Sequence, residues 1–172
     1  MIFVTSYWIA IERAADIDPR FIISLMDPGS TYSLPRGPSL ERHIHIAVND
    51  IAPGEVQYAE PHVVPNADHV GQIVEFARTW DGQGRVLVHC MGGVSRSSAA
   101  GLILLAARHP GREAHIARLL RQRGPWVNPN SMMVRLADGL LGCNRALVTA
   151  LAQMGEPTMR GVLEPVELPD HW

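Results

Sequence analysis

The chain has 172 residues, a net charge of −2 and a hydrophobic fraction of 47%. This length predicts a single domain over residues 1–172, and the weak net charge argues against a protein that binds nucleic acid through bulk charge. We expect the apolar start to form a strand rather than a signal peptide, and no apolar stretch is long enough to cross a bilayer. Two cysteines are too few for a disulfide framework, so we expect a cytoplasmic protein.

The first part of the chain is predicted to supply three strands. Residues 2–9 are rich in aliphatic and aromatic side chains and predict a strand, followed by a short helical or turn segment. Residues 20–25 (RFIISL) are a brief apolar run before the turn sequence MDPGS, which predicts a buried strand. Residues 42–48 (RHIHIAV) alternate between polar and apolar side chains and predict a third strand.

The remainder predicts one central strand and several helices. Asn66 precedes apolar residues at helical spacing and is a candidate N-cap, while residues 85–89 (RVLVH) are typical of a buried parallel strand. The tail, residues 155–172, holds three prolines and is predicted to be extended. The order of elements predicts an α/β fold, with a central, mostly parallel sheet of about four to five strands flanked by helices. Further helices are predicted over residues 98–107, 113–123, 131–141 and 145–153.

One loop carries the candidate chemistry: HCMGGVSRS, residues 89–97, between the central strand and a buried helix. The start of a helix presents unpaired N–H groups and a partial positive charge, so it can bind an anion. Gly92 and Gly93 allow the backbone to curl, and Arg96 can then donate two hydrogen bonds to phosphate oxygens. Cys90 lies in the same positive field, which favours the nucleophilic thiolate.

This stretch matches the signature His-Cys-x-x-Gly-x-x-Arg-Ser and resembles the protein tyrosine phosphatase superfamily, especially its compact dual-specificity branch and small bacterial members. The segments IHIAVND and NPNSMMVRLADGLL resemble the acid loop before the signature and the helix after it, so the resemblance spans residues 40–142. Gly92 stands where many members carry Ala. The resemblance implies the cysteine-phosphatase fold, with signature positions filled by His89, Cys90, Gly93, Arg96 and Ser97.

The resemblance implies a double displacement that needs no metal and no cofactor. Cys90 attacks phosphorus, and Ser97 donates to its sulfur as the thiolate leaves in the second step. His89 orients the loop from behind, and Asn130 braces it. The phosphate oxygens are held by the Arg96 guanidinium and by backbone N–H groups of Met91, Gly92, Gly93, Val94, Ser95 and Arg96.

A general acid is also required, because the leaving oxygen must be protonated. Asp50 and Asp27 both follow predicted strands, and either could simply form a turn. The resemblance places the acid after the strand that precedes the signature strand, which favours Asp50. Asp27, Glu55 and Glu60 remain alternatives.

The sequence therefore predicts a phosphatase whose partner is a phosphorylated protein or a small phosphomonoester, with neither nucleic acid nor membrane as partner. The preferred reading is a tyrosine or dual-specificity protein phosphatase. A phosphatase of small-molecule or lipid phosphates is an alternative, although residues 91–95 of the loop are uncharged. A phospho-binding module without turnover is another alternative. A rhodanese-like sulfur transferase ranks lower, because its reaction gives no reason for the Arg-Ser pair. The oligomeric state stays open.

Overall fold

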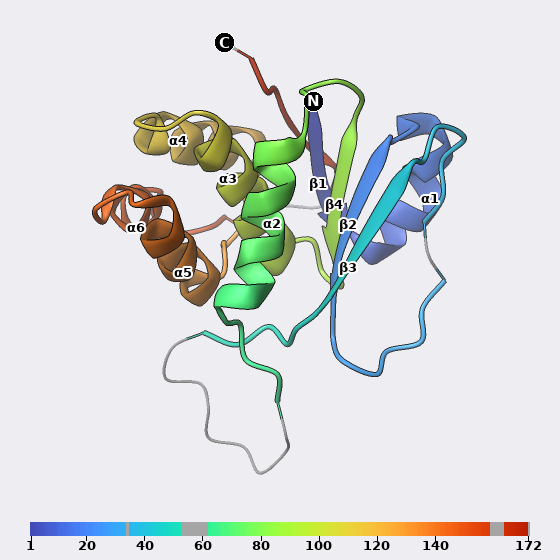
Figure 1. Ribbon diagram of the computed structural model, residues 1–172, viewed down its shortest axis with the longest axis horizontal. Coiled ribbons are helices and arrows are strands. Elements are labelled where there is room, and N and C mark those ends of the chain that lie inside the picture. The colour runs from blue at the N-terminus through green and yellow to red at the C-terminus, as the bar shows by residue number, and fades with distance from the viewer. Residues whose placement is uncertain (34, 53–61, 159–163, 172) are drawn as a thin grey trace.

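The described residues form a five-stranded sheet, as the computed structural model shows (Figure 1). The structure describes residues 1–33, 35–52, 62–158 and 164–171. The sheet order is β3-β2-β4-β1-β5, in which the first four strands are parallel and β5 is antiparallel to β1. This confirms the predicted α/β class and the mostly parallel sheet. The strands are β1 (Ile2–Ser6), β2 (Phe21–Met26), β3 (Arg42–Ala47), β4 (Val86–Cys90) and β5 (Val166–Leu168).

The central strand β4 is buried along its whole length, as its apolar run Val86–Val88 predicts. It pairs with β1 on one side and β2 on the other, so that Ser6 lies opposite Cys90 and Ser24 lies opposite His89. Because these strands are parallel, their carboxyl ends meet at one edge of the sheet. The loop that follows Cys90 therefore lies where α/β sheets bind their ligands.

The first strand is shorter than predicted: the strand expected over residues 2–9 ends at Ser6, and helix α1 (Tyr7–Ile17) begins at the next residue. The Ser6 hydroxyl accepts a hydrogen bond from the N–H of Ile9 and caps the helix. A side-chain cap of this kind satisfies a helix N–H that the strand conformation would leave to solvent. The β-propensity of Tyr7 and Trp8 is overridden by this local interaction.

Helices cover both faces of the sheet (Figure 1). On one face α1 packs its Ala10 and Ala14 against Ile22 and Leu87. Asn66 caps α2 as predicted, accepting from the N–H groups of the first turn. The opposite face carries α2 (Ala67–Thr79), α3 (Arg96–Arg108), α4 (Glu113–Arg123), α5 (Ser131–Leu141) and α6 (Ala146–Ala152).

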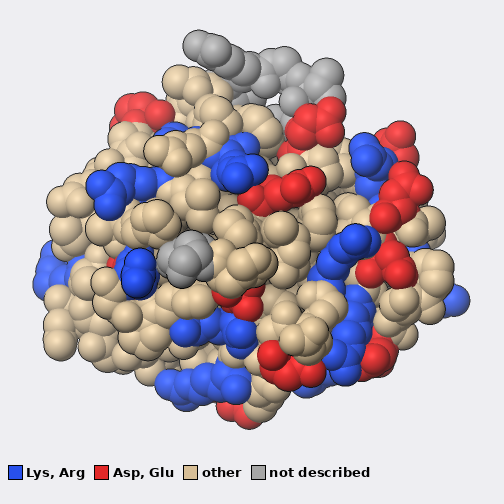
Figure 2. All heavy atoms as spheres, turned by 90° about the horizontal axis from the view of Figure 1, so that it is seen from above, with Lys and Arg blue, Asp and Glu red and all other residues tan. Residues whose placement is uncertain are grey.

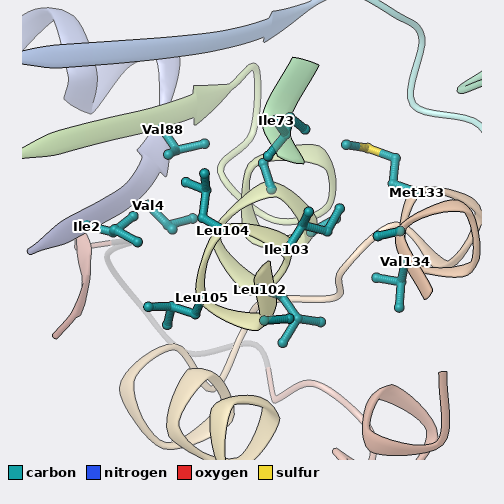
Figure 3. Close-up of a cluster of buried hydrophobic side chains, with 14 of the residues drawn as sticks. Ile2, Val4, Ile73, Val88, Leu102, Ile103, Leu104, Leu105, Met133 and Val134 are labelled. Carbon is teal, nitrogen blue, oxygen red and sulfur yellow. The ribbon is translucent and has the colours of Figure 1, made fainter. Parts of the chain in front are cut away.

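Helix α3 is the centre of the larger core. Residues 102–105 are completely buried and radiate from it toward the sheet and the surrounding helices (Figure 3). Gly101 lets α3 approach the sheet, because a Cβ at this position would lie only 2.6 Å from Cγ2 of Val4. The helix that begins at the signature loop is thus fixed against β1 on one side and against helices on the other.

The tail joins the sheet rather than merely running extended over it. Within the segment predicted as an extended tail, Val166 and Leu168 are buried in β5, and Leu168 pairs with Ile2. Next to the strand, Asp170 accepts a hydrogen bond from Nε of Arg108 at 2.7 Å. These contacts attach the end of the described chain to β1 and to the end of α3.

The described surface shows no extended area of one charge on the face seen in Figure 2, where Arg side chains are interspersed with Asp and Glu. This agrees with the weak net charge. Among the described residues, no helix has both the length and the apolar character needed to span a membrane.

The docked tail gives a first prediction. Replacing Leu168 by Ala removes a fully buried side chain between β1 and α3, and we expect the free energy of unfolding to fall by about 2–5 kcal/mol. Urea denaturation followed by circular dichroism measures this change. Glu167→Ala in the same short strand is the matched control, because its side chain is exposed and the expected change is below about 0.5 kcal/mol. Equal effects of the two changes would show that β5 is not docked.

Candidate active site

The candidate site lies at the carboxyl edge of the parallel strands, where β4 ends at Cys90 and α3 begins at Arg96. Only residues 91–95 connect a buried strand to a buried helix, so the loop has little freedom. Its backbone must turn back over the end of β1, and Gly93 makes this possible. Gly93 has φ of +72°, and a Cβ there would lie 2.5 Å from the backbone N of Ser6. Gly92, by contrast, has no atom within 4 Å of an added Cβ.

Two groups, one in the loop and one in the first turn of α3, contact the Cys90 sulfur. Sγ lies 3.3 Å from the Ser97 hydroxyl and accepts the Gly93 N–H at 3.3 Å. The thiol is 2% exposed, so these contacts lie in a protected environment. Both contacts place polar groups directly beside the sulfur.

The loop backbone also offers unused donors. Among the described residues, the N–H groups of Met91, Gly92, Val94 and Ser95 have no hydrogen-bond acceptor. They lie at the amino end of α3, whose dipole adds a partial positive charge. This combination of unpaired N–H groups and helix dipole is suited to an anion such as phosphate.

Arg96 supplies the permanent charge beside this loop. Its side chain is 5% exposed, and Nη1 donates to Oδ1 of Asp27 at 2.8 Å and to the Val48 carbonyl at 2.7 Å. The Nε atom is buried and has no partner within the described residues. An arginine buried this deeply needs compensation, which Asp27 provides in part.

Asp50 is held beside the loop by two donors. The Ser95 hydroxyl donates to Oδ1 of Asp50 at 2.6 Å, and Nδ2 of Asn130 donates to the same oxygen at 2.9 Å. Nδ2 of Asn130 also donates to the Ile51 carbonyl, and its Oδ1 accepts the N–H of Met133 and so caps α5. The carboxylate is therefore fixed, yet exposed to solvent at the edge of the loop.

Three backbone donors hold the loop from outside. The N–H groups of Tyr7, Asn128 and Asn130 donate to the carbonyls of Met91, Val94 and Ser95, respectively. The carbonyls are thereby turned outward, which leaves the N–H groups free to face inward. The brace that the resemblance implied for Asn130 is present, and Asn128 shares it.

His89 lies behind the loop on the α1 face of the sheet. Its Nε2 lies 2.5 Å from the Ser24 hydroxyl. Burial, with a smaller contribution from His43, lowers the pKa of His89 to about 4. The imidazole is therefore neutral at physiological pH. No group of three His, Cys, Asp or Glu side chains in the described part of the chain is arranged to hold a metal ion.

Known proteins match this chain in structure but not in sequence. No family model matches it, and no curated protein is similar to it in sequence. Human DUSP28 is 17% identical, with a TM-score of 0.60 over 84% of this chain and 94% of its own. The Yvh1 phosphatase domain from Chaetomium thermophilum is 22% identical, with a TM-score of 0.60 over 85% of this chain and 93% of its own. PTPMT1 is 14% identical, with a TM-score of 0.58 over 89% of this chain and 95% of its own.

The chain has the fold of the compact dual-specificity phosphatases. At these identities the structural likeness establishes the fold, while the chemistry must be argued from the residues themselves.

Within this dual-specificity phosphatase fold, the structure brings most of the predicted site residues together. Cys90, Ser97 and Arg96 belong to one loop and helix start, and Asp50 reaches that loop through Ser95. Glu55 and Glu60 lie outside the described residues.

Two features of the site were missed from the sequence. The pairing of Asp27 with Arg96 was not expected, although Asp27 was noticed as a strand-end carboxylate. The bond from Ser24 to His89 was also missed; the only signal was a polar residue inside an apolar run.

The two loop glycines predict opposite outcomes. Gly93→Ala forces a Cβ into the β1 backbone, so we expect binding of inorganic phosphate to weaken by about tenfold or more. Gly92→Ala meets no atom and should bind within about twofold of wild type, since no steric change is imposed. Isothermal titration calorimetry on folded protein measures both. Equal binding by the two variants would contradict the loop geometry.

Proposed function

We propose that this protein is a cysteine-dependent phosphomonoester hydrolase, most simply a protein tyrosine or dual-specificity phosphatase. The observation that carries the proposal is the position of Cys90 and Arg96 on one loop at the amino end of α3. The sulfur there accepts an N–H, and further N–H groups are free for phosphate. Both cysteines are unpaired thiols, and the proposal includes a reducing compartment such as the cytoplasm, in which Cys90 stays reduced.

In the first step the Cys90 thiolate attacks phosphorus. The Sγ–P bond forms as the bond from phosphorus to the leaving oxygen breaks. Asp50 transfers its proton to that oxygen and becomes a carboxylate. Arg96 and the loop N–H groups stabilise the charge on the three remaining oxygens.

In the second step a water molecule attacks the cysteinyl phosphate. Asp50 accepts the proton of the water as the new P–O bond forms. The Sγ–P bond breaks, and the electron pair returns to sulfur. The Ser97 hydroxyl, 3.3 Å from Sγ, donates to the departing thiolate, and inorganic phosphate is released.

Asp27 has a different role in this proposal. Its Oδ1 is engaged by Arg96 and by the Asn49 amide, so it serves as a counter-charge that positions the guanidinium. Among the described residues, the donors that bind Asp50 at the loop edge are neutral. The geometry thus supports Asp50 as the acid over Asp27.

Hydrolysis of a small aryl phosphate without added metal tests the proposal. We expect Cys90→Ser to abolish turnover, because the hydroxyl is a much weaker nucleophile than a thiolate. Asp50→Asn should lower kcat by about 10²–10⁴-fold. It should also flatten the alkaline limb of the pH profile, along which the rate falls as the general acid loses its proton. Asp27→Asn is the comparison variant: we expect a raised KM with the pH profile retained.

Activity that survives Cys90→Ser would refute the nucleophile. Folded wild type that binds a phosphopeptide without any turnover would instead indicate a phospho-binding module. Loss of the pH limb in Asp27→Asn but not in Asp50→Asn would exchange the roles of the two carboxylates.

Aromatic side chains beside the loop support aryl phosphates, such as phosphotyrosine, as substrates. The Tyr7 N–H bonds to the loop at Met91, and the rings of Trp8 and Tyr32 each lie 5.0 Å from the Tyr7 ring. Trp8 is 68% exposed and Tyr32 is 39% exposed, so neither is needed to fill the core. The uncharged residues 91–95 offer nothing for highly anionic lipid or inositol phosphates beyond the backbone.

Trp8→Ala tests this preference. We expect the ratio of kcat/KM for an aryl phosphate to that for an alkyl phosphate to fall by about 3–10-fold, because a ring contact is lost. The control is Ile11→Ala, an exposed apolar residue one turn further along α1. A ratio unchanged in Trp8→Ala would exclude this ring from substrate selection.

A further inference from the structure

A chain of three polar side chains crosses the sheet behind the candidate nucleophile. The Ser24 hydroxyl lies 2.6 Å from Nε2 of His43 and 2.5 Å from Nε2 of His89. Ser24 is 1% exposed and His89 is 1% exposed, whereas His43 is only partly buried. The chain therefore runs from the surface side of β3, through β2, to the residue before Cys90.

These three hydrogen-bonded side chains can hold only one arrangement of protons at a time. A serine hydroxyl carries one proton, so it donates to one imidazole and must accept from the other. The two Nε2 atoms are thus in opposite states: when one carries a proton, the other is bare. The tautomers of His43 and His89 are coupled through Ser24.

The surroundings favour one of the two directions. A contact with the Cys90 backbone raises the pKa of His89 against the stronger effect of burial, although no backbone atom meets hydrogen-bond geometry with Nδ1. Because Nε2 faces Ser24, the proton that this contact favours is on Nδ1. His43 then donates from Nε2 to Ser24, and Ser24 donates to His89. Protonation of His43 enforces the same direction, since a protonated imidazole can only donate.

No fixed charge competes with this arrangement in the cavity beside it. The described residues lining this cavity, of about 30 Å³, include no Asp, Glu or Arg. The titratable groups that face the chain there are His45 from β3, Tyr7 from α1 and Tyr32 from the loop after β2. Burial, and next the neighbouring His45, lower the pKa of His43.

We propose that Ser24 and His43 are positioning residues that hold His89 with its proton on Nδ1 and thereby promote the thiolate of Cys90. The Nδ1–H group presents the positive end of its dipole to the backbone of Cys90, which favours a negative charge on that residue. Outer hydrogen bonds orient a functional imidazole in the same way at metal sites. The inference deepens the proposed function, because it assigns how the nucleophile of that reaction is prepared.

Two measurements that do not need turnover test the proposal. Nitrogen-15 NMR of histidine-labelled protein reports directly which ring nitrogen of His89 carries the proton. The pH dependence of Cys90 alkylation by iodoacetamide, followed by peptide mass spectrometry, reports the thiolate. Cys143 does not interfere, because burial first, then Glu113 and Asp138, raise its pKa to about 11.

Four variants separate positioning from simple packing. Ser24→Ala removes the shared hydroxyl, and His43→Leu removes the outer donor at a partly exposed site. His43→Gln keeps an N–H donor near the Nε2 position without a titratable ring. His45→Gln is the matched control, because His45 lies in register with Ser24 but makes no hydrogen bond to it.

We expect wild-type His89 to carry its proton on Nδ1. Ser24→Ala and His43→Leu should lose this single tautomer and raise the alkylation midpoint of Cys90 by about half a pH unit or more. His43→Gln and His45→Gln should both resemble wild type. A proton on Nε2 of His89 in wild type, or an unchanged midpoint in His43→Leu, would overturn the inference. These results stand even if aryl phosphates are not hydrolysed, so a failure here is distinct from a failure of the proposed function.

Discussion

The close passage of the loop over the end of β1 is the constraint on which the site depends. Gly93 crosses the Ser6 backbone at a distance that admits no side chain, and the N–H of the next residue, Tyr7, donates to the Met91 carbonyl. The loop is thereby fixed between a buried strand and a buried helix. A loop fixed in this way has the preorganisation that an anion site needs.

Burial of Arg96 follows from the same geometry. The helix that starts at this residue is packed on all sides, so its first side chain cannot reach solvent easily. Asp27 and the Val48 carbonyl compensate part of the charge, and each comes from the end of a neighbouring parallel strand. Three adjacent strand ends of the sheet therefore supply both the candidate nucleophile and the groups that compensate the charge of the arginine.

Polar side chains also lie inside the sheet itself. Ser24 and His89 occupy positions on the α1 face that apolar residues could fill. Nδ1 of His89 has no hydrogen-bond partner among the described residues, a cost that a purely structural role leaves unexplained. Asp50 shows the opposite solution, since it is exposed but fixed by two donors. One carboxylate and one imidazole are held by hydrogen bonds on either side of the loop.

The sequence by itself determined the α/β class, the central strand, the capped helix after Asn66 and the loop of Cys90, because these depend on local spacing and burial pattern. The sequence predicted too long a first strand, because the cap at Ser6 overrides the β-propensity of the aromatic residues that follow it. Only the tertiary structure decided that the tail completes the sheet, that Asp27 pairs with Arg96 and that Ser24 joins two histidines. These contacts join residues far apart in the chain, and strand order and register bring them together, which no local pattern specifies.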